Sequence, residues 1–142
     1  MLDPSLLEAY RQTNYGFDNT LLNVDKPCSK AVSLLQPFTP DGGLFITAWN
    51  PLGKELTVKD NKIANQKLKA ELLKQGLNVI DGYGESKDAK WREDSFFAYP
   101  VNKETSLKLC CDFHQNAVVY VSFEGAPELL LHPEFSCQKY FG

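Results

Sequence analysis

The stretch LFITAW at residues 44–49 decides how the rest of this chain folds. It is short and apolar, it is rich in aromatic and β-branched side chains, and it lies between the turn-forming Gly42 and Gly43 and the pair Asn50-Pro51. Such a run between two turn signals predicts a strand that is buried on both faces. A strand of this kind lies inside a sheet, so we expect strands on both sides of it and helices above it.

Helices and strands follow this strand in a regular order. The longest helix is expected at 58–75, where Thr57 and Asp60 resemble a capping box and Gly76 suits the position after the last turn. Further strands are predicted at 77–80, 91–101, 117–123 and 128–131, with a second helix at 103–113. The order strand, helix, strand, strand, helix, strand predicts an α+β fold with a ferredoxin-like split βαβ core at about 44–131.

The N-terminal part of the chain is expected to form an extension that packs on this core. A helix starting near Pro4, an edge strand at 17–24 and a helix at 29–36 are predicted there. A length of 142 residues is typical of one domain, and no linker-like segment separates 1–43 from 44–142. A different α+β sheet that includes residues 17–24 is the alternative.

Composition and charge exclude several classes of protein. The formal net charge is −3 and the pI is about 5.4, with no basic patch, so we expect no nucleic-acid partner. The first residues lack the pattern of a secretory signal, and no apolar run approaches the roughly 18 residues of a membrane span. These features predict a cytoplasmic protein without membrane association.

The cysteines do not have the spacing of a metal site. The chain has Cys28, Cys110, Cys111 and Cys137 and only two histidines, His114 and His132. Adjacent helical residues such as Cys110 and Cys111 point about 100° apart, so they are poor ligands for one ion. We therefore expect buried free thiols, no metal and no cofactor.

The predicted topology gathers polar residues at one edge of the sheet. In a split βαβ core the first and second strands end at the edge where the third and fourth strands begin. The segments at this edge are Asn50, residues 82–84, residues 91–93, and Gln115 with Asn116. The N-terminus of the helix at 58–75 opens at the same edge and adds free N–H groups.

Several of these residues form a recognisable pattern. It consists of Thr47-Ala48-Trp49-Asn50-Pro51, then Asn65, then Trp91-x-Glu93-x-Ser95-Phe96, then Gln115-Asn116-Ala117. Over about 44–121 this pattern resembles the bacterial domain-of-unknown-function family 3293. The resemblance implies no activity, cofactor or partner, but it marks Asn50, Asn65, Glu93, Ser95, Gln115 and Asn116 as the site positions. The chain departs from the family pattern at His114, where a glycine is expected beside the glutamine, and this departure implies a changed backbone.

Each candidate residue also has a purely structural explanation. Asn50 before Pro51 suits a turn, and Asn116 suits a helix C-cap. Glu93 is the candidate for acid–base catalysis, with His114 as a helper by residue type only. The structural alternatives are pairing of Glu93 with Arg92 or a lysine and a surface or capping role for His114. Trp91 suits either core packing or stacking on a planar ligand.

Three hypotheses about function follow from these residues. The leading one is a binding or regulatory module that holds a polar small molecule at the convergent edge, because asparagine and glutamine side chains both donate and accept hydrogen bonds. The second is a small enzyme that uses Glu93 as acid or base. The third is an interaction module that forms a homodimer through the exposed sheet face, with Phe45, Phe97 and Tyr120 at the interface.

Overall fold

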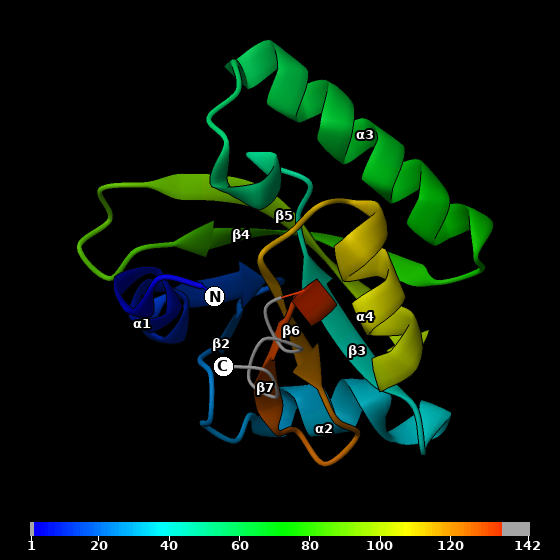
Figure 1. Cartoon of the computed structure of the whole chain (residues 1–142). Coiled ribbons are helices and arrows are strands. Elements are labelled where there is room, and N and C mark those ends of the chain that lie inside the picture. The colour runs from blue at the N-terminus through cyan, green and yellow to red at the C-terminus, as the bar shows by residue number, and fades with distance from the viewer. Residues whose placement is uncertain (1, 135–142) are drawn as a thin grey trace.

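The computed structural model describes residues 2–134, which fold into one antiparallel sheet with helices on both of its faces (Figure 1). In chain order the elements are α1 (Pro4–Gln12), β1 (Asn14–Phe17), β2 (Thr20–Leu22), α2 (Ser29–Leu35), β3 (Gly42–Ile46), α3 (Val58–Lys74), β4 (Asn78–Glu85), β5 (Arg92–Val101), α4 (Lys103–Asp112), β6 (Ala117–Val121) and β7 (Pro127–Leu131). The predicted α+β class is therefore confirmed.

The sheet has seven strands within the described residues, in the order β2-β1-β4-β5-β3-β6-β7. All neighbouring strands are antiparallel. The four strands β4, β5, β3 and β6 form its centre, and the hairpin β1–β2 and the strand β7 extend it on either side. All five residues of β3 are buried, which confirms that its two faces are covered.

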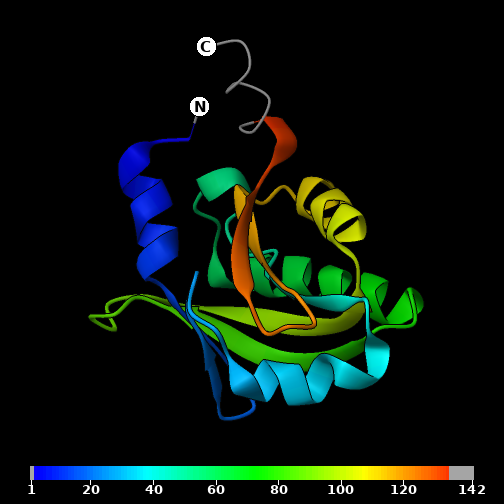
Figure 2. The same ribbon diagram turned by 90° about the horizontal axis from the view of Figure 1, so that it is seen from below.

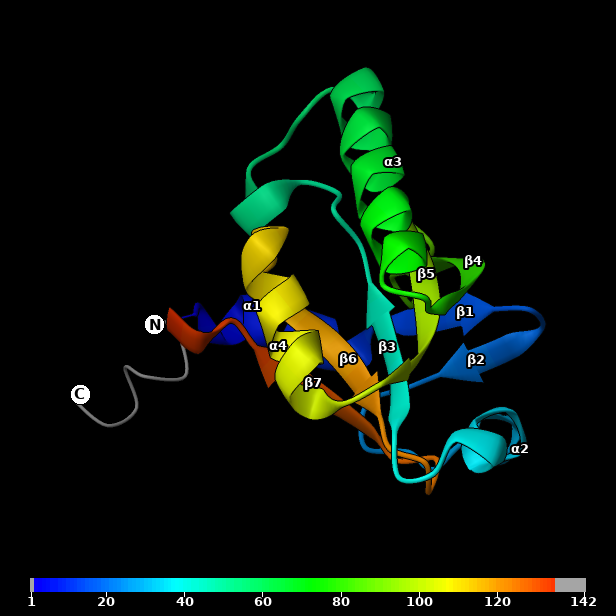
Figure 3. The same ribbon diagram turned by 90° about the vertical axis from the view of Figure 1, so that its right-hand side faces the viewer.

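Two separate hydrophobic layers cover the two faces of the sheet (Figure 2). On one face, Leu68 and Leu72 of α3 and Leu109 of α4 pack against Leu44 and Ile46 of β3. The opposite face is covered by the hairpin and α2. There, the ring of Phe17 stacks on that of Phe97 at 4.2 Å, next to Leu22, Leu35 and Val121. Figure 3 shows α4 and α2 on opposite sides of β3.

The prediction of one edge strand at 17–24 was wrong in detail. This part of the chain is a hairpin that begins earlier, at Asn14, and β1 pairs with both β2 and β4. Asp18 and Asn19 form its turn with φ values of 44° and 59°. Both residue types tolerate this left-handed backbone, which suits a two-residue hairpin loop. The sheet therefore includes residues from the N-terminal extension.

The sequence pattern ends the strand at 77–80 and predicts a turn at residues 81–84, and this was also wrong, because β4 runs from Asn78 through to Glu85. Gly82 lies opposite Phe17 in β1, and a Cβ atom on Gly82 would come within 2.4 Å of the Gly16 carbonyl oxygen. Glycine is needed here for close approach of the two strands rather than for a turn. The local sequence could not distinguish these two uses of glycine.

The proposed dimer surface is covered by the chain's own elements. Phe45, Phe97 and Tyr120 have exposed fractions of 4%, 0% and 9%, and Phe45 and Phe97 belong to the layer under α2 and the hairpin. The sheet face that was expected to be bare is thus a second core, and these three side chains are not available to a partner.

The described thiols are free, and they differ in burial. Cys110 is buried, and Cys28 and Cys111 are partly buried. Burial raises the pKa of the Cys110 thiol to about 12. No group of three or more potential metal ligands is found within residues 2–134. Cys137 and the aromatic residues Phe135, Tyr140 and Phe141, which were expected to pack on the domain, lie outside the described residues. None of the helices described is both long and apolar enough to cross a lipid bilayer.

Candidate functional site

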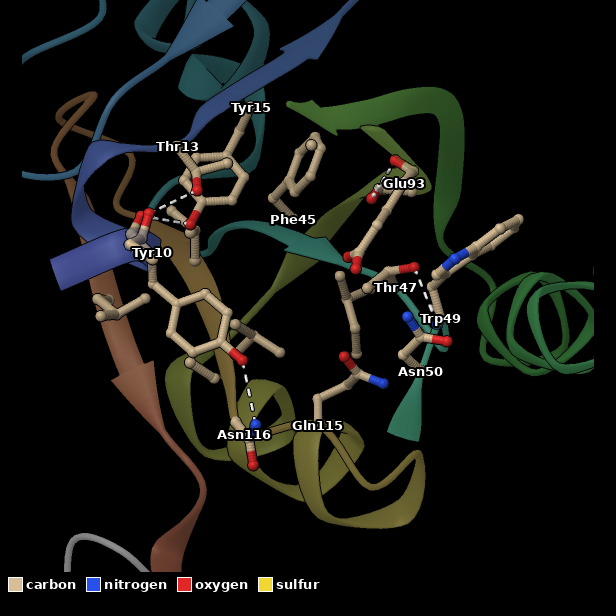
Figure 4. Close-up of a pocket in the computed structure, with 18 of the residues that line it drawn as sticks. Tyr10, Thr13, Tyr15, Phe45, Thr47, Trp49, Asn50, Glu93, Gln115 and Asn116 are labelled. Carbon is tan, nitrogen blue, oxygen red and sulfur yellow. Dashed lines mark hydrogen bonds between the residues drawn. The ribbon is translucent and has the colours of Figure 1, made fainter. Parts of the chain in front are cut away.

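A cavity of about 420 Å³ opens at the end of the sheet, between α1 and the sheet face opposite α3 and α4 (Figure 4). Successive side chains of a strand point to opposite faces, so Glu93 and Ser95 of β5 share the face of Phe97. Phe45 of β3 and Val119 of β6 belong to the same face. The cavity is therefore the polar end of the core layer beneath α2 and the hairpin.

The cavity brings together most of the residues predicted from the sequence. Asn50, Trp91, Glu93, Ser95, Gln115 and Asn116 all line it. They come from the end of β3, the start of β5 and the segment before β6, which meet because β3 is antiparallel to both β5 and β6. The convergent edge inferred from the order of elements thus exists in the fold.

Asn65 lies behind the cavity wall and does not line it. This side chain of α3 is 5% exposed, and its amide group is saturated by the protein. Its Oδ1 accepts hydrogen bonds from the Ala48 backbone N–H at 2.8 Å and from Thr47 Oγ1 at 3.3 Å. Its Nδ2 donates to the Asp94 carbonyl at 2.9 Å. Asn65 therefore ties the end of β3 to β5 and holds the turn that carries Asn50.

A second buried asparagine, Asn61, supports Asn50. The Asn61 Oδ1 accepts from the Asn50 backbone N–H at 2.8 Å, and its Nδ2 donates to Asn50 Oδ1 at 2.9 Å. The Asn50 Oδ1 also accepts from the Leu56 backbone N–H at 3.0 Å. Since this backbone N–H can only donate, the Asn50 side chain must present its oxygen there. Its NH2 group is left for the cavity, and the backbone of Asn50 is left-handed, with φ 46°.

The turn prediction and the ligand prediction for Asn50 are thus compatible. Its backbone makes the turn after β3, while its side-chain nitrogen has no partner among the described residues. The N-terminus of α3 does not belong to the cavity lining. Thr57 Oγ1 caps it by accepting from the Asp60 N–H at 3.1 Å, and neither residue lines the cavity. The expected contribution of this helix end to the site was wrong.

Glu93 is the most unusual group in the cavity. Its side chain is half-buried, and within residues 2–134 its carboxylate has neither a hydrogen-bond donor nor a cationic partner. Burial alone raises the pKa of this carboxyl from 4.5 to about 7. Close to neutral pH the group therefore exists in both its protonated and its charged form.

The expected pairing of Glu93 with Arg92 does not form. The Arg92 guanidinium lies over the ring of Tyr83, 3.8 Å from its centroid, and its Nη1 is 3.7 Å from Glu85 Oε2. Arg92 and Glu93 are adjacent in β5, so their side chains point to opposite faces of the sheet. The carboxylate of Glu93 consequently has no counter-charge from its neighbour.

Gln115 and Asn116 bring amide groups to the opposite wall (Figure 4). Gln115 Nε2 donates to the Phe113 carbonyl at 3.2 Å. A carbonyl only accepts, so the nitrogen must lie there, and the Gln115 oxygen has no protein donor in the described part of the chain. Asn116 Nδ2 donates to the Tyr10 hydroxyl at 3.1 Å, which joins the start of β6 to α1.

The sequence analysis did not predict that residues of α1 and β1 belong to the site. Tyr10 and Tyr15 line the cavity, and the Tyr15 hydroxyl donates to the Tyr10 carbonyl at 2.6 Å. Burial raises the pKa of both phenols, so both are neutral at physiological pH. Thr47 and Trp49 also line the cavity. The TAWNP motif contained these two residues, whereas nothing in the local sequence pointed to the tyrosines.

His114 does not reach the cavity, so it is not available there as a catalytic helper of Glu93. Its side chain is exposed and does not line the cavity. Its backbone has φ 53°, the left-handed conformation that glycine adopts most readily, and its carbonyl accepts from the Leu52 N–H at 2.6 Å. The histidine therefore occupies a backbone conformation that would also suit the glycine expected at this position.

This backbone conformation gives a prediction for position 114. We expect His114→Gly to keep or raise the free energy of unfolding by up to about 1 kcal/mol, because glycine has no Cβ to strain in this conformation. His114→Val should lower it by about 1 to 2 kcal/mol, since a β-branched residue is disfavoured there. Urea denaturation of both variants measures the difference. A glycine variant that is less stable than the valine variant would contradict the left-handed assignment.

Comparison with known proteins places the central part of the chain in a family. A family model described as "Protein of unknown function (DUF3293)" matches residues 46–118. The chain belongs to this family. The matched region of this DUF3293 member contains the cavity residues from Ile46 to Val118, whereas Tyr10 and Tyr15 lie outside it. Neither a curated protein nor a solved structure matches the chain.

Proposed function

We propose that this protein binds a polar small molecule in the cavity and that Glu93 is its main anchor. The observation that carries the proposal is the unpartnered Glu93 carboxylate inside an otherwise well hydrogen-bonded wall. A carboxylate that lines a cavity, has no partner among the described residues and has a raised pKa is a candidate binding group. The side-chain nitrogen of Asn50 and the side-chain oxygen of Gln115, which have no partners among the described residues, are further candidates for ligand contact.

The size and lining of the cavity support the same proposal. A volume of about 420 Å³ lies within the usual range for small-molecule sites. Such sites are mostly apolar with a few fixed polar groups, and here Tyr15, Phe45 and Val119 supply much of the apolar surface. A network of buried asparagines holds the polar wall, so the groups proposed to bind are positioned before a ligand arrives.

We also infer that the four central strands with α3 and α4 are a ferredoxin-like core. The strand order β4-β5-β3-β6, all antiparallel, supports this inference, as does the packing of both helices on one face. In this arrangement the N-terminal extension completes the site, because α1 and β1 cover an end of the sheet that the core alone leaves open. The proposed binding site is thus built by residues of both the N-terminal extension and the core.

Nuclear magnetic resonance with a library of polar fragments tests the proposed function. The reporters are the side-chain amide signals of Gln115 and Asn116 and the indole N–H signals of Trp49 and Trp91. We expect a subset of fragments to shift these signals together. The exposed side-chain amide of Asn78, which lies outside the cavity, is the internal control. If no fragment shifts the cavity reporters at millimolar concentration, the binding proposal is wrong.

A second candidate function is catalysis with Glu93 as general acid or base. The specific observation in its favour is a carboxyl pKa of about 7 in a cavity, because a group with a pKa near the working pH transfers protons most effectively. Tyr10 is the nearest candidate for a second role, since its hydroxyl accepts from Asn116 and keeps its own proton available. His114 has no part in this proposal.

The catalytic candidate predicts a difference between two variants. We expect the wild-type protein to consume a compound from the small-molecule fraction of a cell extract that Glu93→Gln leaves unchanged, with mass spectrometry as the readout. Glu124→Gln, which alters an exposed carboxylate outside the cavity, should behave like wild type. Equal consumption by wild type and Glu93→Gln would exclude Glu93 as the catalytic acid or base.

A further inference from the structure

The charge balance of the cavity identifies the kind of ligand. Among the described residues that line it, only Arg92 and Glu93 have acidic or basic side chains. The Arg92 guanidinium is turned to Tyr83 and Glu85, so Glu93 supplies the only charge that faces the space. A neutral or anionic ligand would leave the ionised carboxylate without compensation, and such an uncompensated charge is costly when it is desolvated.

The hydrogen-bonding groups of the cavity also favour a cationic ligand. Both carboxylate oxygens of Glu93 and the side-chain oxygen of Gln115 lack donors within residues 2–134. Figure 4 shows the two side chains reaching toward the same space, Glu93 from β5 and Gln115 from the segment before β6. A group with several N–H donors could engage acceptors on both sides at once.

The aromatic lining adds a third feature. Tyr10, Tyr15, Trp49 and Trp91 all line the cavity, and Trp91 is 40% exposed. Aromatic rings attract cations through the negative potential of their faces. The helix N-terminus that would suit an anion, that of α3, is capped by Thr57 and lies outside the cavity.

From these observations we infer that the ligand is a small organic cation whose charge is carried by N–H groups, such as an amidine, guanidine or primary amine on an apolar body. The cationic group would bind the Glu93 carboxylate and the Gln115 oxygen, and the apolar body would lie against the aromatic lining. This inference rests on the proposed function, since it names the chemical class of the ligand for the same cavity.

Three probes of nearly equal shape test the inference: benzamidine, benzamide and benzoate, which are cationic, neutral and anionic. Isothermal titration calorimetry at pH 8 measures their affinities for the full-length protein. We expect benzamidine to bind at least tenfold more tightly than benzamide, and benzoate to bind most weakly. With Glu93→Gln the preference of benzamidine over benzamide should fall to about threefold or less, because the carboxylate is gone.

Gly84 provides a way to locate the bound probe. A Cβ atom on this glycine of β4 would lie 3.8 to 4.0 Å from Thr13, Tyr15 and Ser95, which are ordinary contacts at the cavity wall. Gly84→Val should therefore fold and place two extra methyl groups toward the cavity. We expect it to weaken benzamidine binding at least tenfold, and Gly84→Ala to weaken it less, with thermal unfolding as the check on folding.

The pH dependence of binding is an independent readout. Benzamidine stays cationic from pH 6 to pH 8, so its affinity should increase over this range as Glu93 loses its proton. The other titratable groups among the described residues that line the cavity are Tyr10 of α1 and Tyr15 of β1, which stay neutral, and Arg92 of β5, whose guanidinium faces Tyr83. With Glu93→Gln the affinity should be independent of pH.

Several outcomes would overturn the cation inference. They are an affinity for benzamide or benzoate that equals or exceeds that for benzamidine, no detectable benzamidine binding at millimolar concentration, and benzamidine binding that Gly84→Val leaves unchanged. If one of these occurs while other fragments shift the Gln115 and Asn116 signals, only the ligand class is wrong. If no fragment shifts those signals, the proposed binding function fails as well.

Discussion

Replacement of Asn65 by alanine is expected to lower the free energy of unfolding by about 3 kcal/mol. The side chain is 5% exposed and bonds the Ala48 N–H at 2.8 Å and the Asp94 carbonyl at 2.9 Å. Its removal leaves the buried Ala48 N–H without a partner, which costs about 1 to 3 kcal/mol, and takes one of two donors from the Asp94 carbonyl, which keeps its bond from Thr47 Oγ1 at 2.7 Å. Urea denaturation followed by circular dichroism measures the loss.

Two further variants separate this network from a general effect of asparagine removal. Asn65→Asp keeps an acceptor for the Ala48 N–H but loses the donor to the Asp94 carbonyl, so we expect an intermediate loss of about 2 kcal/mol. Asn78→Ala removes an exposed amide that bonds only the Tyr99 carbonyl, at 3.3 Å, and should cost less than about 1 kcal/mol. An Asn65→Ala variant as stable as Asn78→Ala would mean that the turn after β3 is held by other contacts.

The second large effect is expected from Glu93→Gln, and it depends on pH. Burial raises the pKa of this carboxyl to about 7 in the folded protein, compared with 4.5 as its ordinary value. The folded state therefore holds the proton more tightly than the unfolded chain does. By linkage, the contribution of Glu93 to the free energy of unfolding should fall as the pH rises from about 4.5 to about 7, and then stay level.

Glutamine has the shape of the protonated carboxyl and does not titrate. The Glu93→Gln variant should match the wild type near pH 4.5 and exceed its free energy of unfolding by about 2 kcal/mol at pH 8. This value is below the full conversion of the pKa difference, because the half-buried side chain keeps some solvent contact. Urea titrations at pH 4.5, 6 and 8 give the comparison.

An exposed acid serves as the control for this pH effect. Glu124 is exposed in the turn between β6 and β7, and Glu124→Gln should change the free energy of unfolding by no more than about 0.5 kcal/mol at any of these pH values. Parallel pH profiles for the wild type and Glu93→Gln would mean that the Glu93 carboxyl is solvated in the folded protein. The charge argument for the ligand would then lose its basis.

The expected gain in stability of the Glu93→Gln variant is also evidence about the function of Glu93. A group that costs stability in the free protein but serves binding is typical of functional sites, where stability and activity are traded against each other. We therefore expect Glu93→Gln to gain stability and to lose the preference for a cationic probe. A structural role for Glu93 would predict a loss of stability instead.

Both the α+β class and the convergence of the polar residues at one edge of the sheet could be predicted from the sequence. Local patterns were sufficient for the class, because apolar runs, caps and glycines placed α3, β3 and β6 within a few residues of their observed bounds. The order of these elements then fixed which strand ends meet. For this reason the sequence predicts that Asn50, Glu93 and Gln115 lie at one edge of the sheet, where all three line the cavity.

The sequence could not determine which of these residues face the cavity and which lie behind it. Asn50 and Asn65 are both predicted as site residues, yet the Asn65 amide bonds backbone groups while Asn50 keeps its side-chain nitrogen free of partners among the described residues. Asn65 bonds these backbone groups because its side of α3 faces the turn after β3. That orientation is set by packing of Leu68 and Leu72 on the sheet, not by the residues around each asparagine.

Contacts between segments that are far apart in sequence close the cavity and leave the Glu93 carboxylate unpaired. Tyr10 reaches the cavity because the hairpin β1–β2 joins the sheet at β4, a pairing between distant segments that no local pattern encodes. Likewise, Arg92 lies beside Glu93 in sequence but on the other face of β5, where Tyr83 and Glu85 hold it. The unpaired carboxylate, on which the proposed function depends, is therefore a consequence of long-range strand pairing.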